Sequence, residues 1–260
     1  MGRSFSVLGD IAILNFSEGV RKAERKRVAK AILEKNKSIK TVLEKSKNFG
    51  GRLRKMKTRV LAGADNKEVL YKENGCVFRF NVDETYFSPR LSNERKEVAS
   101  KIKKGEDVLV MFAGVSPFPI VIAKNSKAGK IYSNEINRKA NQYSKWNIDR
   151  NKVGQKVFLL PGDIKKVAER LKKQRKKFDV IVMPRPQLKD SFLKSAFDLS
   201  KKGTRIYYYD FCNANEISKI VDKIKREAKD CGKKIRILKS KPAGDIAPYK
   251  IRCRVDFKVV

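Results

Sequence analysis

Short apolar runs alternate with stretches of helical spacing over residues 101–260. The apolar runs predict strands at 108–112, 130–133, 157–160, 179–183, 204–209, 235–240 and 250–259. The stretches between them predict helices at 117–124, 137–150, 164–176, 188–199 and 215–231. Strands separated by helices form a mostly parallel sheet with right-handed crossovers. The predicted fold class is therefore α/β, a doubly wound Rossmann-like sheet that ends in an antiparallel C-terminal hairpin.

The first part of the chain has a mixed pattern of strands and one helix. A strand with a break at Gly9-Asp10 is predicted over residues 6–14, and a helix with a basic outer face over 21–33. Asn74-Gly75 is a hairpin-turn signal between two further strands. The short strands predicted here are 41–43, 58–61, 68–71 and 76–80. We predict two domains: a small basic α+β domain that binds RNA at 1–84, and the Rossmann-like domain at 85–260.

The charge of the chain indicates what kind of molecule it binds. The chain has 63 Lys and Arg against 28 Asp and Glu, a net charge of +35, and residues 21–59 hold 16 basic and 3 acidic residues. A field this strong favours a polyanionic partner, RNA or DNA. No helix pairs a basic face with a broad apolar one, so we expect no membrane partner. The alternative is a lysine-rich chain whose helix faces are only solvated.

Residue usage excludes several kinds of chemistry. The chain has no histidine, which removes histidine-based triads and most zinc hydrolase schemes. Four cysteines are scattered without a Cys-x-x-Cys spacing, so we expect neither a metal site nor disulfides. No apolar run is long enough to span a membrane, and no secretory signal pattern is present. These features are typical of a cytoplasmic protein.

A cofactor site is predicted at the carboxyl ends of the strands, where doubly wound sheets bind ligands. The first strand ends at Phe112-Ala113-Gly114, and a glycine turn there lets backbone approach a ligand closely. Glu135, after the second strand, is placed to accept hydrogen bonds from ribose hydroxyls, or else it caps the next helix. Asp163, after Gly162, is placed to hold an adenine amino group, or else it is the N-cap of the following helix. Because the turn lacks a full G-x-G-x-x-G, the set favours S-adenosyl-L-methionine over NAD.

Several motifs together resemble a known family. The most specific is Tyr86-Phe87-Ser88-Pro89-Arg90-Leu91-Ser92-Asn93-Glu94-Arg95. Others are 5–13, Leu61-Ala62-Gly63, Glu73-Asn74-Gly75, 111–115, Met183, Tyr207-Tyr208-Tyr209 and Ala247-Pro248-Tyr249. With these motifs the chain resembles the archaeal and eukaryotic-type tRNA (guanine-37-N1)-methyltransferases. The resemblance implies a methyltransferase sheet, S-adenosyl-L-methionine as cofactor, and the anticodon stem-loop of tRNA as partner.

The resemblance also implies roles for single residues. Glu94 matches the general base for the guanine N1 proton, and Arg54 falls on the arginine that stabilises charge on O6, with Arg52 as a near alternative. The residues implied around the cofactor are Arg95, Phe112, Ala113, Gly114, Glu135, Gly162, Asp163 and Met183. Those implied around the substrate are Arg52, Arg90, Pro184 and Arg185.

This chemistry is consistent with the residue types. Guanine N1 is a poor nucleophile while protonated, and a positioned carboxylate takes the proton as the methyl group transfers. A guanidinium near O6 stabilises the enolate-like charge. The target base must leave its stack, which calls for phosphate contacts nearby. The alternative for Glu94 is an ion pair with Arg90, Arg95 or Lys96 on an exposed helix.

The chain departs from the family pattern at identifiable positions. Val110 stands where members usually have an acidic residue, Ser116 replaces the second glycine of the turn, and Pro184-Arg185-Pro186 replaces a motif beginning with asparagine. We also expect no counterpart of the extra N-terminal domain with which many members grip the tRNA elbow. Two alternatives remain: an aminocarboxypropyl transferase of wybutosine synthesis with the same cofactor, or a non-catalytic tRNA-binding homologue. An open doubly wound sheet is expected to be a monomer, not a knotted dimer.

Overall fold

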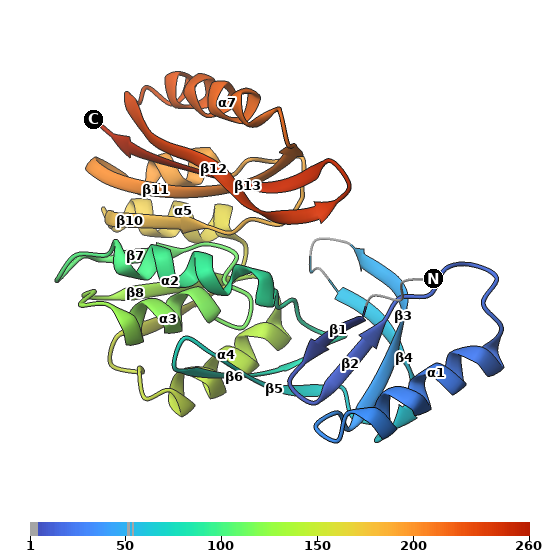
Figure 1. The fold of residues 1–260 in the computed structure, drawn as a ribbon. Helices are drawn as coiled ribbons and strands as arrows, with labels where there is room; N and C mark the ends of the chain where they lie inside the picture. Colours follow the sequence, from blue (N-terminus) through green and yellow to red (C-terminus); the bar gives the residue numbers. More distant parts are fainter. Residues whose placement is uncertain (1–4, 51–52, 54) are drawn as a thin grey trace.

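The computed structural model describes residues 5–50, 53 and 55–260. These residues form a seven-stranded sheet flanked by helices, a two-stranded hairpin, and a four-stranded sheet that packs against α1 (Lys22–Lys35) (Figure 1). The four-stranded sheet and α1 lie to one side of the large sheet (Figure 1). The mixed α+β character predicted for the first part of the chain is confirmed.

The N-terminal sheet has the order β1-β2-β3-β4. The strands are β1 (Phe5–Leu8), β2 (Ile11–Leu14), β3 (Thr41–Gly50) and β4 (Lys55–Gly63). α1 connects the parallel pair β2 and β3, and the other two pairs are antiparallel. The sequence predicted only the apolar parts of β3 and β4, because their remaining residues are held by ladder pairing and not by an apolar pattern.

The hairpin of β5 (Glu68–Glu73) and β6 (Cys76–Asn81) joins the N-terminal sheet to the large one. Its turn residues, Asn74 and Gly75, both have positive φ, as the Asn-Gly signal predicted. Cys76, Phe78 and Phe80 are buried in the same apolar core as the helices α2 (Ser92–Ser100) and α3 (Pro117–Asn125). This hairpin lies on the N-terminal side of the division predicted at residue 84, and the division itself stays a prediction.

Side chains from α4 (Arg138–Arg150) and from its C-cap residue bind the outer edge of β6. Asn147 accepts a hydrogen bond from the Arg79 amide (2.7 Å) and donates to its carbonyl (3.2 Å). Asn151 does the same for Val77, at 2.9 and 2.7 Å. These two amides take the place of a neighbouring strand, because an unpaired strand edge would leave buried backbone groups unsatisfied.

The large sheet has the order β12-β13-β11-β10-β7-β8-β9. Its parallel strands are β7 (Val108–Val110), β8 (Ile131–Glu135), β9 (Val157–Pro161), β10 (Phe178–Met183) and β11 (Ser200–Asn213). The closing strands, β12 (Ile235–Ala247) and β13 (Lys250–Val259), are antiparallel, with β13 inserted beside β11. The predicted doubly wound α/β class with an antiparallel C-terminal hairpin is confirmed.

Helices cover both faces of this sheet. The bounds are α2 (Ser92–Ser100), α3 (Pro117–Asn125), α4 (Arg138–Arg150), α5 (Ile164–Lys173), α6 (Leu193–Asp198) and α7 (Ile217–Asp230), with a 3-10 turn at Pro89–Leu91 before α2. Alternate β7 residues enter two separate cores: Val108 and Val110 join that of α2 and α3, and Leu109 joins that of α5, α6 and α7. β7 lies between β10 and β8. The strand order therefore reverses at β7.

Candidate active site

A cavity opens at the carboxyl ends of β7, β8 and β10, where the strand order reverses. It encloses about 790 Å³, part of it open to solvent. Of the predicted cofactor residues, it brings together Arg95, Phe112, Ala113, Gly114 and Glu135. The remaining wall comes from Leu53, Tyr86, Phe87, Ser88, Leu91, Pro117, Phe118, Ile136, Asn137, Ala140, Pro184, Arg185, Pro186, Phe211 and Arg252.

The turn after β7 shapes one wall of the cavity. Phe112, Gly114 and Ser116 all have positive φ, at 58°, 59° and 64°, so β7 ends at Val110 and not at 112 as predicted. A Cβ on Gly114 would lie 3.2 Å from the Tyr86 carbonyl oxygen. Ser116, in place of a second glycine, is stabilised by a buried hydroxyl network with Ser133 (2.8 Å) and Ser144 (2.9 Å).

Glu135 both lines the cavity and fixes the turns around it. Its Oε2 accepts a hydrogen bond from the Gly114 amide, and its Oε1 accepts one from the Asn137 amide, both at 2.8 Å. Burial raises the pKa of Glu135, and these backbone hydrogen bonds oppose that shift. Asn137, not Glu135, is the N-cap of α4. The carboxylate is thus held in place at the cavity wall without a cationic partner among the contacts described.

Gly162 and Asp163 line a smaller neighbouring cavity. Phe112, Ile136 and Pro186 belong to the walls of both cavities. Asp163 is the N-cap of α5, and its Oδ1 accepts a hydrogen bond from the Lys165 amide at 2.7 Å. The capping alternative for Asp163 is therefore confirmed, while its role toward adenine stays a prediction.

Arg95 lines the main cavity, and its side chain is oriented by contacts with other protein groups. It is 1% exposed and forms a two-bond pair with the Glu73 carboxylate, in which Nη2 to Oε2 measures 2.6 Å. Its Nη2 also donates to the Ser88 carbonyl at 2.9 Å. The Arg95 guanidinium lies 5.1 Å from the centre of the Phe87 ring. The Glu73-Asn74-Gly75 motif thus contributes the carboxylate that orients Arg95.

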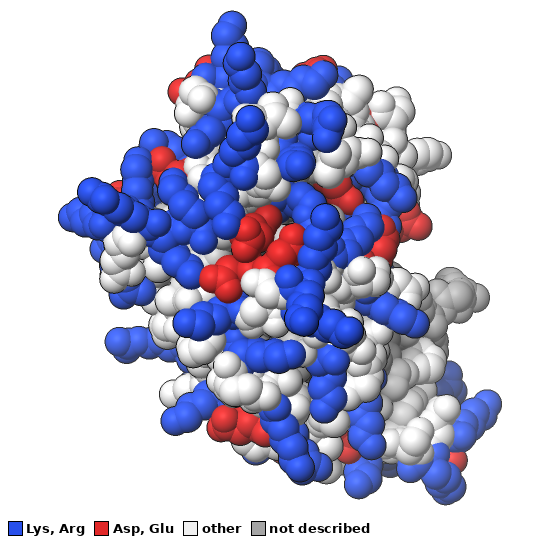
Figure 2. Space-filling model, turned by 90° about the vertical axis from the view of Figure 1, so that its left-hand side faces the viewer, with Lys and Arg blue, Asp and Glu red and all other residues white. Residues whose placement is uncertain are grey.

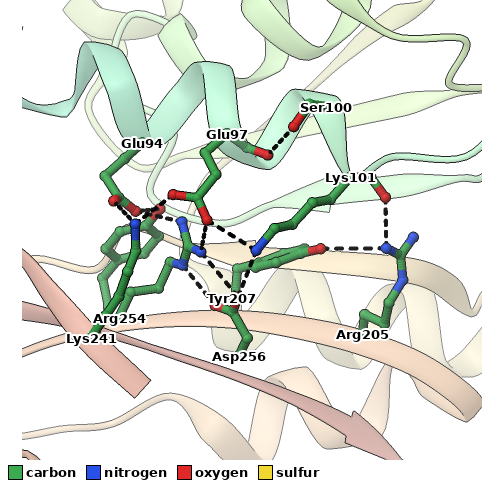
Figure 3. Close-up of polar contacts among 10 residues, drawn as sticks. Glu94, Glu97, Ser100, Lys101, Arg205, Tyr207, Lys241, Arg254 and Asp256 are labelled. Atoms are coloured by element: carbon green, nitrogen blue, oxygen red, sulfur yellow. Dashed lines mark hydrogen bonds and ion pairs between the residues drawn. The ribbon is translucent and has the colours of Figure 1, made fainter. Parts of the chain in front are cut away.

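Glu94 lies behind the cavity wall, in a buried ionic cluster between α2 and the C-terminal strands (Figure 3). Its Oε2 accepts hydrogen bonds from Arg254 Nη1 (2.6 Å) and from the Tyr209 hydroxyl (2.9 Å). Its Oε1 pairs with Lys241 Nζ at 2.6 Å. Burial, followed by the Glu94 charge, raises the pKa of Tyr209 well above its usual value, so the phenol stays a donor.

The cluster balances carboxylates against cations. Its carboxylates are Glu94, Glu97 and Asp256, and its cations are Lys101, Lys241 and Arg254. Arg254 has no exposed surface and contacts all three carboxylates. Figure 3 shows these groups meeting below α2. The sequence alternative for Glu94 was an ion pair with Arg90, Arg95 or Lys96. The observed ion-pair partners are instead Lys241 and Arg254.

The remaining predicted residues lie in different environments. Met183 is fully buried in the core of α5, α6 and α7 and does not line the cavity. Pro184 and Arg185 do line it, but the Arg185 guanidinium donates to Tyr208, Asp210 and the carbonyls of Pro186 and Leu188. Arg90 is exposed and donates to the Asp245 carbonyl. Arg52 and Arg54 fall outside the described residues.

Phe211 and Arg252 line the cavity and were not predicted. They are direct neighbours on β11 and β13, where Phe211 pairs with Arg252 in the ladder. Arg252 lies just after the Ala247-Pro248-Tyr249 motif, and this position was the only sequence feature that pointed to it. The pairing of β13 with β11, which brings Arg252 beside Phe211, could not be predicted from a single sequence.

The family is shown by comparison with known proteins. A model of the TRM5/TYW2 methyltransferase domain matches residues 69–238. The chain belongs to the TRM5/TYW2 methyltransferase family. A model of the TYW2 N-terminal domain also matches residues 1–66, so the two models together account for most of this TRM5/TYW2 chain. The predicted resemblance is confirmed.

Named relatives include archaeal tRNA methyltransferases. The chain is 33% identical to the tRNA (guanine(37)-N(1))-methyltransferase Trm5b of Pyrococcus abyssi over 98% of this chain and 74% of that protein. It is 31% identical to the tRNA (guanine(37)-N(1))/4-demethylwyosine(37)-methyltransferase Taw22 of Nanoarchaeum equitans, over 99% of this chain and 100% of that protein.

Solved structures of the same family superpose on this TRM5/TYW2 chain. Wild-type Trm5b from Pyrococcus abyssi gives a TM-score of 0.86 at 32% identity, covering 98% of this chain and 74% of that one. A complex of aTrm5 with tRNALeu gives 0.84 at 29% identity, covering 99% and 72%. The fold is therefore a known methyltransferase architecture.

Two further observations concern the residues that the structure describes. Among them, no group of three or more Cys, Asp or Glu residues is arranged to hold a metal ion. No helix within the same residues is long and apolar enough to cross a membrane.

Proposed function

We propose that this chain transfers the methyl group of S-adenosyl-L-methionine to N1 of guanosine 37 in tRNA. The observation that carries the proposal is the cavity itself, which brings the Phe112-Ala113-Gly114 turn, Glu135 and Arg95 together in a TRM5/TYW2 chain. The relatives named above for guanosine 37 methylation, and the solved complex of aTrm5 with tRNALeu, support the same target.

The residues around the cavity suit the proposed cofactor. Glu135 offers carboxylate oxygens at the end of β8, fixed by two backbone hydrogen bonds, for ribose hydroxyls. The neighbouring cavity, with Phe112 and Ile136 as shared walls and Asp163 at its rim, suits an adenine ring. Gly114 and Arg95 line the same cavity and would border the amino-acid end. When bound, S-adenosyl-L-methionine supplies a methyl group on a sulfonium centre.

Glu94 and Arg54 are the proposed catalytic residues. Glu94 would take the N1 proton of guanine, and Arg54, outside the described residues, would stabilise charge on O6. Glu94 sits directly before Arg95 on α2, and its partner Tyr209 packs against Phe118 of the cavity wall. The proposal therefore requires that base binding bring Glu94 from the cluster to the cavity.

Basic surfaces are proposed to hold the tRNA. Lys and Arg side chains are spread over the whole face shown in Figure 2, with acidic side chains grouped between some of them. Exposed Arg90 is a proposed phosphate contact, and so is Arg52, which falls outside the described residues. Pro184 is proposed as a wall beside the target base, and Arg185 as the residue that holds this wall rigid, since its guanidinium is bound by protein groups.

The alternative is transfer of the aminocarboxypropyl group from the same cofactor, because TYW2 structures share this fold. The two reactions leave different by-products. Methyl transfer leaves S-adenosylhomocysteine, and aminocarboxypropyl transfer leaves methylthioadenosine. Incubating the protein with S-adenosyl-L-methionine and a tRNA transcript, then separating the nucleosides by chromatography, is expected to give S-adenosylhomocysteine in proportion to modified tRNA. Methylthioadenosine as the product would replace the proposal by the alternative.

A further inference from the structure

Three arginines of the described residues line the main cavity, and they differ in their partners. Arg95 is paired with Glu73, and Arg185 with Asp210 at 2.7 Å. Arg252 forms no ion pair with any carboxylate of the described residues. Its described contacts are neutral: Nη2 donates to the Tyr86 hydroxyl at 3.1 Å, and the guanidinium lies 5.2 Å from the centre of the Phe211 ring. A half-buried guanidinium without a carboxylate is a ready site for an anionic or strongly accepting oxygen.

The position of Arg252 points to the target base. Its neighbours Phe211 and Tyr86 line the cavity with it, as does Pro184, which follows β10. A flipped base must enter this cavity, while its phosphates stay outside on the solvent side. Phe211 offers an aromatic wall of the kind on which bases stack.

We propose that Arg252 recognises the target base by donating to its carbonyl oxygen at position 6. This inference rests on the proposed function. A guanidinium has only hydrogen-bond donors, so it can donate to guanine O6 but cannot pair with the amino group that adenine carries at that position. Arg252 thereby acts as a specificity-determining residue in addition to the role proposed for Arg54.

A double-mutant cycle tests the contact directly. One change is Arg252→Gln, and the other is 2-aminopurine at position 37 of the tRNA, which removes the oxygen at position 6 together with the proton on N1. The Kd of each tRNA is measured with the full chain saturated by S-adenosylhomocysteine. We expect either single change to raise the Kd about 10- to 100-fold. The two changes together should cost less than the sum of the two single changes, because both remove the contact between Arg252 and O6.

Matched variants separate this contact from general charge effects. Arg236→Gln removes the same charge from an exposed position on β12 and should leave the preference for guanine intact. Arg252→Lys keeps the charge without the planar fork and should restore part of the affinity. An unchanged Kd for S-adenosylhomocysteine shows that each variant is folded; if Arg252→Gln fails this check, Arg252→Lys completes the cycle.

Other outcomes would overturn the inference. Equal weakening of both tRNAs by Arg252→Gln would assign Arg252 to a phosphate. A raised Kd for S-adenosylhomocysteine with an unchanged Kd for methylthioadenosine would assign it to the cofactor carboxylate. Failure of the proposed function is distinguishable, because it appears as absence of guanosine 37 methylation by the unaltered protein in a parallel assay with S-adenosyl-L-methionine.

Discussion

At the residue scale, the neighbouring residues Glu94 and Arg95 have charged side chains that lie in different environments. Arg95 faces the cavity and is oriented by Glu73, whereas Glu94 is 7% exposed and joins Arg254, Lys241 and Tyr209. A carboxylate that is already ion-paired loses those contacts when it takes a proton. Its use as a base therefore depends on displacement of those cations by the incoming substrate.

Glu94→Gln is expected to slow single-turnover methyl transfer roughly 100- to 10,000-fold, because an amide cannot accept the N1 proton. The Kd for S-adenosyl-L-methionine should stay nearly unchanged. Glu97→Gln is the matched control, since Glu97 contacts the same Arg254 and Lys241. Equal rate losses in the two variants would make Glu94 a structural residue.

The lowered pKa of Glu97 leads us to expect that the stability of the protein depends on pH. Burial acts to raise the pKa of Glu97, but hydrogen bonds from Arg254, Lys241 and Lys101 outweigh it and hold the pKa well below 4.5. A pKa depressed by folding stabilises the protein above pH 4.5, and this contribution is lost as the pH falls below that value. Urea unfolding should therefore show a loss for Glu97→Gln near neutral pH that shrinks below pH 4.5. A loss that persists unchanged in acid would contradict the assignment.

The sequence predicted which residues line the cavity better than it predicted the contacts that their side chains make. Gly114 and Glu135 follow local strand-turn-helix patterns, so their place at the strand ends was foreseeable. The partners of Glu94 were not, because Lys241 and Arg254 lie on strands far along the chain and are brought to α2 only by sheet pairing. Arg252 was missed for the same reason.

At the element scale, the β5–β6 hairpin depends on α4. Asn147 is fully buried and makes two hydrogen bonds to Arg79 and one to the Val115 carbonyl (3.0 Å). Asn147→Ala would leave these backbone groups unsatisfied, at a cost of about 1–3 kcal/mol each. We expect the free energy of unfolding in urea to fall by about 2 kcal/mol or more. Lys145→Ala, on the exposed side of the same helix, should change it by less than about 0.5 kcal/mol.

Element types were predicted from periodicity more reliably than their bounds. The strand-helix alternation of the large sheet follows from buried apolar runs, and it was right throughout. α6 begins at Leu193 and not at 188, because Asp190 accepts a hydrogen bond from the Phe192 amide and Phe192 takes a left-handed φ of 59°. Such local turn chemistry leaves little trace in an apolar pattern.

At the scale of the whole molecule, the net charge of +35 predicts strongly salt-dependent tRNA binding. Each phosphate contact releases counterions, so a protein with several such contacts loses roughly 1,000-fold or more in affinity between 50 and 200 mM salt. We expect this slope for tRNA and little change for S-adenosyl-L-methionine, measured by titration calorimetry. A flat dependence for tRNA would mean that the basic faces are only solvated.

The most direct test of the central claim is nucleoside mass spectrometry of a tRNA transcript after incubation with the protein and S-adenosyl-L-methionine. The account predicts N1-methylguanosine in a fragment that contains position 37, and its loss when that guanosine is replaced by adenosine. Methylation elsewhere, or none by protein with normal cofactor affinity, would contradict it.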